Sequence, residues 1–179
     1  MDSHSTQSGF TLVELLITIT IATILMSIGI PSYKYVTTSN RVSGEINALL
    51  ADMQFARYEA VKEGLTTKIC PTTAGGTTCS ATATWSSGGW IVLSGAGLVL
   101  RQQLPFSSFN SSDVLTNKAG STAITFNREG YALNLGAIDV FSLHDPNNIP
   151  SYTRCLMLGT SGFLTTMQAG NSPTYGNCT

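Results

Sequence analysis

The fold is decided by Gly9-Phe10-Thr11-Leu12-Val13-Glu14, a stretch that opens an apolar run reaching Ile30 and stopping at Pro31. At 1.5 Å per residue, a helix over this run is long enough to cross about 30 Å of hydrocarbon. Glu14 is the one charged residue in the run. A carboxylate at the bilayer centre costs about 2.5–3.5 kcal/mol, so Glu14 needs a partner or a function, unless it reaches out to water near the headgroups.

Beyond Pro31 the pattern becomes that of an amphipathic helix, with apolar residues recurring at steps of three, four or seven. The stripe consists of Tyr35, Val42, Ile46, Leu49, Met53, Ala56 and Ala60, while Arg41, Glu45, Asp52 and Glu59 line one flank. Pro31 removes a backbone donor and Gly29 adds weakness, so we expect a kink there. Gly64 is a natural stop. A helix from Phe10 to Gly64 would be roughly 80 Å long, so its second half must pack on a globular domain.

From Leu65 onward, short β-rich runs alternate with Gly, Asn, Ser and Pro, which predicts strands. The expected strands cover Thr66–Cys70, Gly89–Ser94, Leu98–Leu104, Thr122–Asn127, Asp139–His144, Thr153–Leu158 and Phe163–Gln168. The second and third of these read as a hairpin, and Pro71–Gly88 and Ser107–Ser121 read as polar loops. The predicted fold class is therefore α+β, with one long helix packed on an antiparallel β-sheet or β-sandwich domain.

Four cysteines, Cys70, Cys79, Cys155 and Cys178, allow three disulfide connectivities. The first two flank a Thr/Gly-rich loop and the last two flank the C-terminal end, so their placement favours sequential pairing. A disulfide that closes a loop of around 15 residues contributes about 3 kcal/mol. Zinc ligation and free thiols are the alternatives, but neither pair has C-x-x-C spacing and His144 is the lone histidine downstream of the leader.

The sequence offers no enzyme site. His4 belongs to the leader and His144 stands alone before Asp145-Pro146, so a Ser/His or Cys/His dyad lacks a convincing base. The carboxylates of the β region (Asp113, Glu129, Asp139 and Asp145) are scattered. Gly95-x-Gly97 leads into a strand rather than a helix, which argues against a phosphate cradle. The formal net charge of -1 provides no global basic field for nucleic acid or anionic lipid. We therefore expect no catalytic residue, no cofactor and no metal.

The N-terminal stretch resembles the start of a type IV prepilin. The resemblance implies that a prepilin peptidase cuts between Gly9 and Phe10, that Phe10 becomes the N-methylated mature terminus, and that Glu14 pairs with an N-terminal amine during assembly. The spacing is compatible, because Glu14 lies one helical turn past Phe10. The expected segments are a leader (1–9), a transmembrane and assembly half of the helix (10–30), an amphipathic half (31–64) and a β-rich domain (65–179).

Downstream motifs resemble the GspH/FimT family of minor pilins and pseudopilins. The helix segment Gln54-Phe55-Ala56-Arg57-Tyr58-Glu59-Ala60-Val61, the Gly89-Trp90-Ile91-Val92 strand and the run Ile124-Thr125-Phe126-Asn127-Arg128-Glu129-Gly130 occur in the order typical of that family. The cysteine placement and the Gly-Trp segment after Cys79 are most similar to the FimU-type minor pilins of type IVa pili.

The resemblance implies a minor pilin that helps to prime or cap assembly at the pilus tip, with other minor pilins and the major pilin as partners through the N-terminal helix. A GspH-like pseudopilin of a type II secretion system is the first alternative. A FimT-like DNA-uptake receptor is the second, but Gly162-Phe163-Leu164-Thr165 lacks both arginines of the G-R-x-R motif. Arg101, Lys118, Arg128 and Arg154 are the weak remaining candidates for binding DNA.

Orientation in the membrane is read from two opposing signals. The leader lacks Lys and Arg while Lys34 and Arg41 follow the span, so the positive-inside rule alone would place the C-terminal domain in the cytoplasm. The prepilin resemblance and the cysteines, which suit an oxidising compartment, favour the opposite orientation. We expect an inner-membrane protein with a periplasmic domain, which moves to the cell surface in the pilus.

Overall fold

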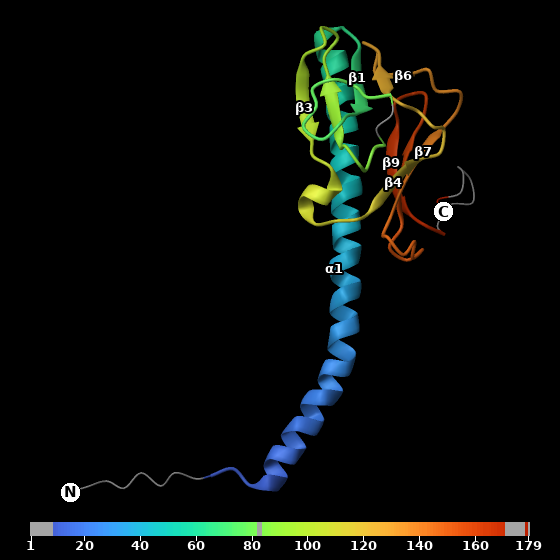
Figure 1. Cartoon of the computed structure of the whole chain (residues 1–179). Helices are drawn as coiled ribbons and strands as arrows, with labels where there is room; N and C mark the ends of the chain where they lie inside the picture. The colour runs from blue at the N-terminus through green and yellow to red at the C-terminus, as the bar shows by residue number, and fades with distance from the viewer. Residues whose placement is uncertain (1–8, 82–83, 171–177, 179) are drawn as a thin grey trace, which may run out of the picture. The chain divides into compact units, whose positions relative to one another are not determined.

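The computed structural model describes residues 9–81, 84–170 and 178, so the leader before Gly9 lies outside the described residues. The chain divides into two compact units that meet between Thr37 and Thr38. A single helix, α1 (Leu12–Glu63), begins in the first unit and ends in the second (Figure 1). Gly64 follows with φ +70°, the left-handed conformation that ends helices, as the sequence predicted. Pro31 lies inside the helix, and the kink expected there stays a prediction.

Two antiparallel sheets complete the C-terminal unit, so the fold is α+β. The first sheet has the order β3-β2-β1-β5-β6, with β1 (Thr67–Pro71), β2 (Trp90–Leu93), β3 (Val99–Gln103), β5 (Ile124–Phe126) and β6 (Ala132–Leu133). The second has the order β4-β7-β8-β9, with β4 (Val114–Asn117), β7 (Asp139–His144), β8 (Arg154–Leu158) and β9 (Leu164–Gln168). In the sequence between β3 and β4, the chain forms the short 3-10 helix η1 (Phe106–Phe109).

The core of this unit is one cluster shared by α1 and both sheets. The helix contributes the buried stripe Val42, Ile46, Leu49, Met53, Ala56 and Ala60, and the strands contribute large side chains that include Ile69, Trp90, Ile124, Phe126, Phe141, Leu143, Leu156 and Leu158. Trp85 packs edge-on against Phe141, with ring centroids 5.0 Å apart. Its indole Nε1 donates to the carbonyl of Ser121, in the connection between β4 and β5, at 3.1 Å. The contact with Phe141 of β7 anchors the segment before β2 to the second sheet.

Every predicted strand is present, with ends shifted by at most two residues, and β2 and β3 form the expected hairpin. The interpretation of Ser107–Ser121 as a loop was wrong at Val114–Asn117, where β4 pairs with β7 along its whole length. The pairing Ala132↔Phe126 and its neighbour also create a short β6 that the sequence did not indicate. β4 depends on a partner strand remote in sequence, and β6 is only two residues long, which is too short for a periodic pattern to reveal it.

The helix pattern also needs two corrections. Tyr35 was placed on the buried stripe, but its side chain is 46% exposed. Asp52 and Glu59 were placed on a charged flank, yet both are buried. The buried stripe of the helix therefore begins at Val42, and it is wide enough to include two carboxylates that have polar partners.

Candidate assembly site

The start of α1 is built by a local cap. Thr11 sits just before the helix, where its Oγ1 accepts a hydrogen bond from the backbone N–H of Glu14 at 3.2 Å, and its carbonyl accepts one from Leu15. Glu14 lies in the first turn, where the helix dipole favours a negative charge. Phe10 is 79% exposed and Glu14 is exposed as well. The Phe10 side chain and the Glu14 carboxylate, one turn later, are thus both accessible to a partner.

The apolar part of α1 presents its side chains outward. From Phe10 to Ile30 every large hydrophobic side chain is more than half exposed, and an 18-residue window of this helix has a mean hydropathy of 2.2. By length and composition this is a helix able to cross a membrane. An apolar surface of this size is not stable in water, so it must be covered by lipid or by other proteins.

Polar side chains within that part of the helix are satisfied internally. The hydroxyls of Thr18, Thr20, Thr23 and Ser27 each donate to a backbone carbonyl three or four residues earlier, at 2.7–2.9 Å. Such bonds let Ser and Thr lie in an apolar environment. The Glu14 carboxylate cannot form such a bond, because an ionised carboxylate accepts hydrogen bonds and has no proton to donate to a carbonyl. It is the group in this run that still needs a donor from elsewhere.

Three motifs quoted from the sequence meet at one end of the C-terminal unit. Arg57 of α1 donates from Nε to the carbonyl of Gly130 at 2.9 Å, in the turn between β5 and β6. Gly162, in the turn between β8 and β9, has φ +74°, and a Cβ at this position would collide with the Gly130 carbonyl. These contacts form one packing unit from three sequence motifs. They are the helix segment around Arg57, the turn that ends at Gly130, and Gly162, the glycine at the place of the G-R-x-R motif.

The Gly-Trp strand β2 contacts a buried carboxylate of α1, Asp52. The indole Nε1 of Trp90 donates to Asp52 Oδ2 at 2.9 Å, and Arg101 Nη1 donates to Asp52 Oδ1 at 3.1 Å. The Arg101 guanidinium also lies over the ring of Phe55, 3.8 Å from its centroid. Asp52 is buried because both of its oxygens have donors, which the helix pattern alone could not indicate.

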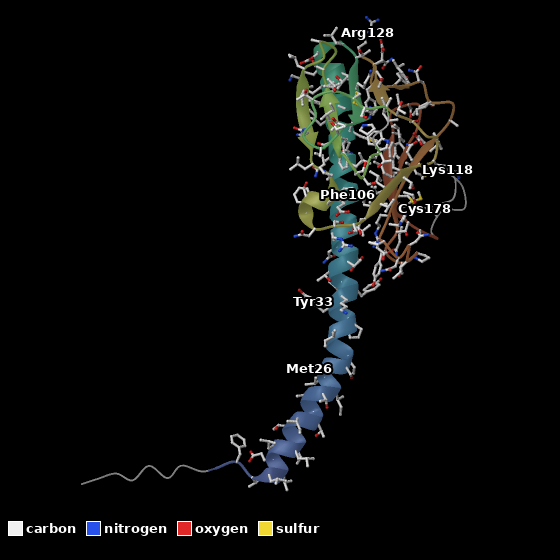
Figure 2. All side chains as sticks on the ribbon, viewed as in Figure 1. Met26, Tyr33, Phe106, Lys118, Arg128 and Cys178 are labelled. Carbon is white, nitrogen blue, oxygen red and sulfur yellow. A yellow bond between two sulfur atoms is a disulfide. The ribbon has the colours of Figure 1, made fainter. Side chains whose placement is uncertain are left out.

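The cysteines form the two sequential pairs that their placement favoured. Cys70 is joined to Cys79 and Cys155 to Cys178, with Cα–Cα distances of 5.5 and 5.8 Å. The second bond holds the end of the chain against β8, where Cys178 packs with Val140 and Met157 (Figure 2).

The four cations considered for nucleic acid do not form one patch. Arg101 is paired with Asp52, and Arg128 donates to Glu129 at 2.7 Å, which lowers the pKa of the Glu129 carboxyl. Arg154 donates to Ser39 Oγ at 2.9 Å and to nearby carbonyls. Lys118 and Arg128 lie far apart in Figure 2. Phe163, at the position of the first motif arginine, is 63% exposed but carries no charge for a phosphate.

Within residues 9–81, 84–170 and 178, no cluster of His, Cys, Asp or Glu side chains could hold a metal ion. His144 ends β7, where its Nδ1 lies 2.9 Å from the carbonyl of Asp145. Asp139 and Asp145 are buried as structural acceptors, the first from Asn117 and the second from the backbone of Asn147 and Ile149. These groups stabilise turns and strand ends rather than pointing into a common cleft.

One charged cluster was missed from the sequence. Arg41 donates from Nε and Nη2 to both oxygens of Asp113, at 2.9 and 2.7 Å, and Glu45 lies one turn further along α1. The signal available was Arg41 and Glu45 at i and i+4, but Asp113 is 72 residues away from Arg41 in sequence. The sequence did not indicate Asp113 as the partner of Arg41, because Asp113 lies in the segment Ser107–Ser121, which was interpreted as a polar loop.

The model of the family described as "Type II transport protein GspH" matches residues 45–162, which contain Asp52, Trp90, Arg57 and both turn glycines. The chain belongs to the GspH family. A second model, described as "Prokaryotic N-terminal methylation motif", matches residues 4–30. The GspH-family domain of this chain is thus joined to the N-terminal element of type IV pilins and pseudopilins.

Two solved structures share the fold of this GspH-family chain. Both are crystal structures of the type IV minor pilin FimU of Pseudomonas aeruginosa, in space groups P21 and P65. Each is 19% identical to this chain over 78% of its length, covering 96% and 99% of the FimU chains, with TM-scores of 0.59 and 0.54. No curated protein matches the chain.

Proposed function

We propose that this GspH-family protein is a minor pilin of a type IV pilus, acting in the tip or priming subcomplex that starts assembly. The observation that carries the proposal is the start of α1: a methylation motif at residues 4–30 and one carboxylate, Glu14, a turn past Phe10 on an outward-facing apolar helix. The likeness of the fold to a minor pilin supports it.

The proposed mechanism follows from the charges at that helix start. Cleavage between Gly9 and Phe10 by a prepilin peptidase creates a new amine on Phe10, which is then methylated. During assembly, Glu14 pairs with the amine of a neighbouring subunit, so two charges that are costly in an apolar surrounding neutralise each other. Burial of the apolar helix among the helices of other minor pilins and the major pilin drives association, and the Glu14 pair sets the register.

The domain boundaries and location belong to the same proposal. Residues 1–9 act as the leader, 10–30 as the transmembrane and assembly half, 31–64 as the amphipathic half and 65–179 as the β-rich domain, with Gly29 and Pro31 allowing a kink. Before assembly the helix lies in the inner membrane with the C-terminal domain in the periplasm, where the two disulfides can form. After assembly the domain is at the cell surface. No cofactor and no catalytic step is assigned.

The test is the composition of purified pili. Mass spectrometry should find this protein beginning at a methylated Phe10, and Glu14→Ala and Glu14→Gln should both reduce its incorporation severalfold. Glu63→Gln, an exposed carboxylate at the other end of the same helix, is the matched control and should incorporate normally. An intact Met1 terminus in pili, or normal incorporation of both Glu14 variants, contradicts the mechanism.

A second candidate is a pseudopilin of a type II secretion system, which the description of the matching family favours. The scaffold and the role of Glu14 are the same in both systems, so the distinction is genetic. Deletion that abolishes surface pili supports the minor pilin, whereas deletion that abolishes protein secretion and leaves pili intact supports the pseudopilin.

A further inference from the structure

The two sheets are connected by residues 104–113, here called the crossover segment. It leaves β3 after Gln103 and enters β4 at Val114, and in Figure 1 it is the yellow segment that passes α1 (Figure 1). Phe106 anchors it, because this ring is buried and packs edge-on against Trp90 with centroids 5.9 Å apart. The carbonyl of Phe106 accepts a hydrogen bond from the N–H of Ser111 at 3.1 Å, which closes the segment on itself.

The far end of the crossover segment is fastened to α1 by a bidentate ion pair. Arg41 donates two hydrogen bonds to the two oxygens of Asp113, whose side chain is fully buried while that of Arg41 is 39% exposed. The backbone of Asp113 is held in place as well, because its N–H donates to Ser111 Oγ at 3.2 Å. A bidentate arginine contact fixes both distance and direction, so this pair decides where the crossover segment lies on the helix.

Glu45 brings a second carboxylate to the same place. Its Oε2 is buried and has no hydrogen-bond partner among the described residues. The pKa of Glu45 is raised to about 7, chiefly by burial and also by the Asp113 carboxylate, while the Ser111 hydroxyl and Arg41 act in the opposite direction. Arg41 directs its Nε and Nη2 donors at Asp113, and its effect on the pKa of Glu45 is coulombic.

The remaining charge near the cluster is already engaged. Asp145, which follows β7, is buried and contributes to the raised pKa of Arg41 after the larger effect of Asp113. Its oxygens accept hydrogen bonds from the backbone of Asn147 and Ile149 at 3.2 and 2.7 Å. Asp145 therefore adds negative charge around Arg41 but cannot relieve Glu45.

We propose that Arg41, Glu45 and Asp113 form a proton-operated latch that fastens the crossover segment to α1 when Glu45 is protonated and weakens when Glu45 is ionised. A neutral Glu45 can be buried beside Asp113 without a second cation, whereas an ionised one faces another carboxylate with a single shared arginine. The latch controls access to Phe106 and to the Trp90 side of the core. It is a property of the folded domain and does not depend on incorporation into a pilus.

The pH dependence follows from linkage. When the crossover segment opens, Glu45 meets water and its pKa returns toward the ordinary value of 4.5. The closed state then binds more protons than the open state between about pH 4.5 and 7, so opening becomes easier as the pH rises through that range, by up to about tenfold per pH unit. Above about pH 7 both states are ionised and the dependence ends.

Hydrogen exchange on the full chain in detergent micelles tests the latch. Amides of residues 106–114 are followed by mass spectrometry from pH 5 to pH 8.5, and their protection factors are corrected for the intrinsic pH dependence of exchange. We expect protection to fall severalfold between pH 5 and pH 7 and to level off above pH 7. In Glu45→Gln the profile should be flat, and in Glu63→Gln, a carboxylate-to-amide change on the exposed end of the same helix, it should match the unchanged protein.

Two results overturn the proposal. One is a flat profile in the unchanged protein, and the other is a Glu45→Gln profile that falls as steeply as that of the unchanged protein. Should Glu45→Gln fail to fold, a carbon-13 titration of the glutamate side chains of the unchanged protein replaces it. A Glu45 carboxyl that titrates near pH 7 supports the latch, whereas one that titrates near pH 4.5 refutes it.

Discussion

The buried Asp52 carboxylate predicts a coupling between α1 and the Gly-Trp strand that can be measured. In Asp52→Ala the indole N–H of Trp90, whose side chain is fully buried, loses its acceptor. A hydrogen bond to a charged group contributes about 1.5–3 kcal/mol. The pair with Arg101, whose side chain is 46% exposed, adds only about 0.5 kcal/mol. We expect Asp52→Ala to lower the free energy of unfolding by about 2–3.5 kcal/mol.

A double-mutant cycle isolates the bond itself. Trp90→Phe removes the donor and keeps most of the ring, so in an Asp52→Ala background it no longer breaks a hydrogen bond. The double variant should therefore be more stable than the sum of the single effects predicts, by about 1.5–2.5 kcal/mol. The assay is urea unfolding of the full chain in detergent micelles, followed by far-ultraviolet circular dichroism.

Glu63→Ala changes an exposed carboxylate on the same helix and should alter the free energy of unfolding by less than about 0.5 kcal/mol. If the effects of Asp52→Ala and Trp90→Phe are additive, the two side chains are not coupled, and the explanation given for burying a carboxylate in this core is wrong.

Three further predictions concern the same domain and the same unfolding assay. Replacing Cys155 and Cys178 by Ser removes a loop closure over 23 residues and should cost about 3.4 kcal/mol, compared with about 2.6 kcal/mol for Cys70 and Cys79, which are separated by 9; equal losses would contradict the loop-length argument. Gly162→Ala should cost about 2 kcal/mol because of its positive φ and the collision with Gly130, whereas Gly136→Ala, which meets open space, should be nearly neutral. The raised pKa of Glu45 means that the folded chain binds more protons, so the free energy of unfolding should fall as the pH rises from about 4.5 to 7 and then stay constant. The shift corresponds to about 3.4 kcal/mol, which the partial solvent access of Glu45 reduces to about 1–2 kcal/mol; Glu45→Gln should remove this slope.

Local signals explain what the sequence predicted well. The three-and-four spacing from Val42 to Ala60 depends only on helix geometry, and the structure buries those positions against both sheets. Gly64 ends the helix because it can adopt a conformation that other residues avoid. The hairpin of β2 and β3 was visible because two apolar runs are separated by Gly95-Ala96-Gly97.

Contacts between remote segments explain what was missed. β4 contains a single buried apolar residue, Leu115, and it exists because β7 supplies the ladder of backbone partners. Asp52 looked like a surface residue because its donors, Trp90 and Arg101, lie 38 and 49 residues away. The same holds for Asp113, whose Ser- and Asn-rich surroundings suggested a loop until Arg41 was placed beside it.

The two arginine contacts at opposite ends of the packed helix have a mechanical consequence. Arg41 holds Asp113 and Arg57 holds the carbonyl of Gly130, and the two arginines are 16 residues apart, which is about 24 Å along the helix axis. A displacement of the helix along its axis by even one residue, about 1.5 Å, strains both contacts at the same moment. Tension applied to α1 is therefore resisted in shear by the C-terminal unit as a whole, with the first sheet loaded through Gly130 and the second through Asp113.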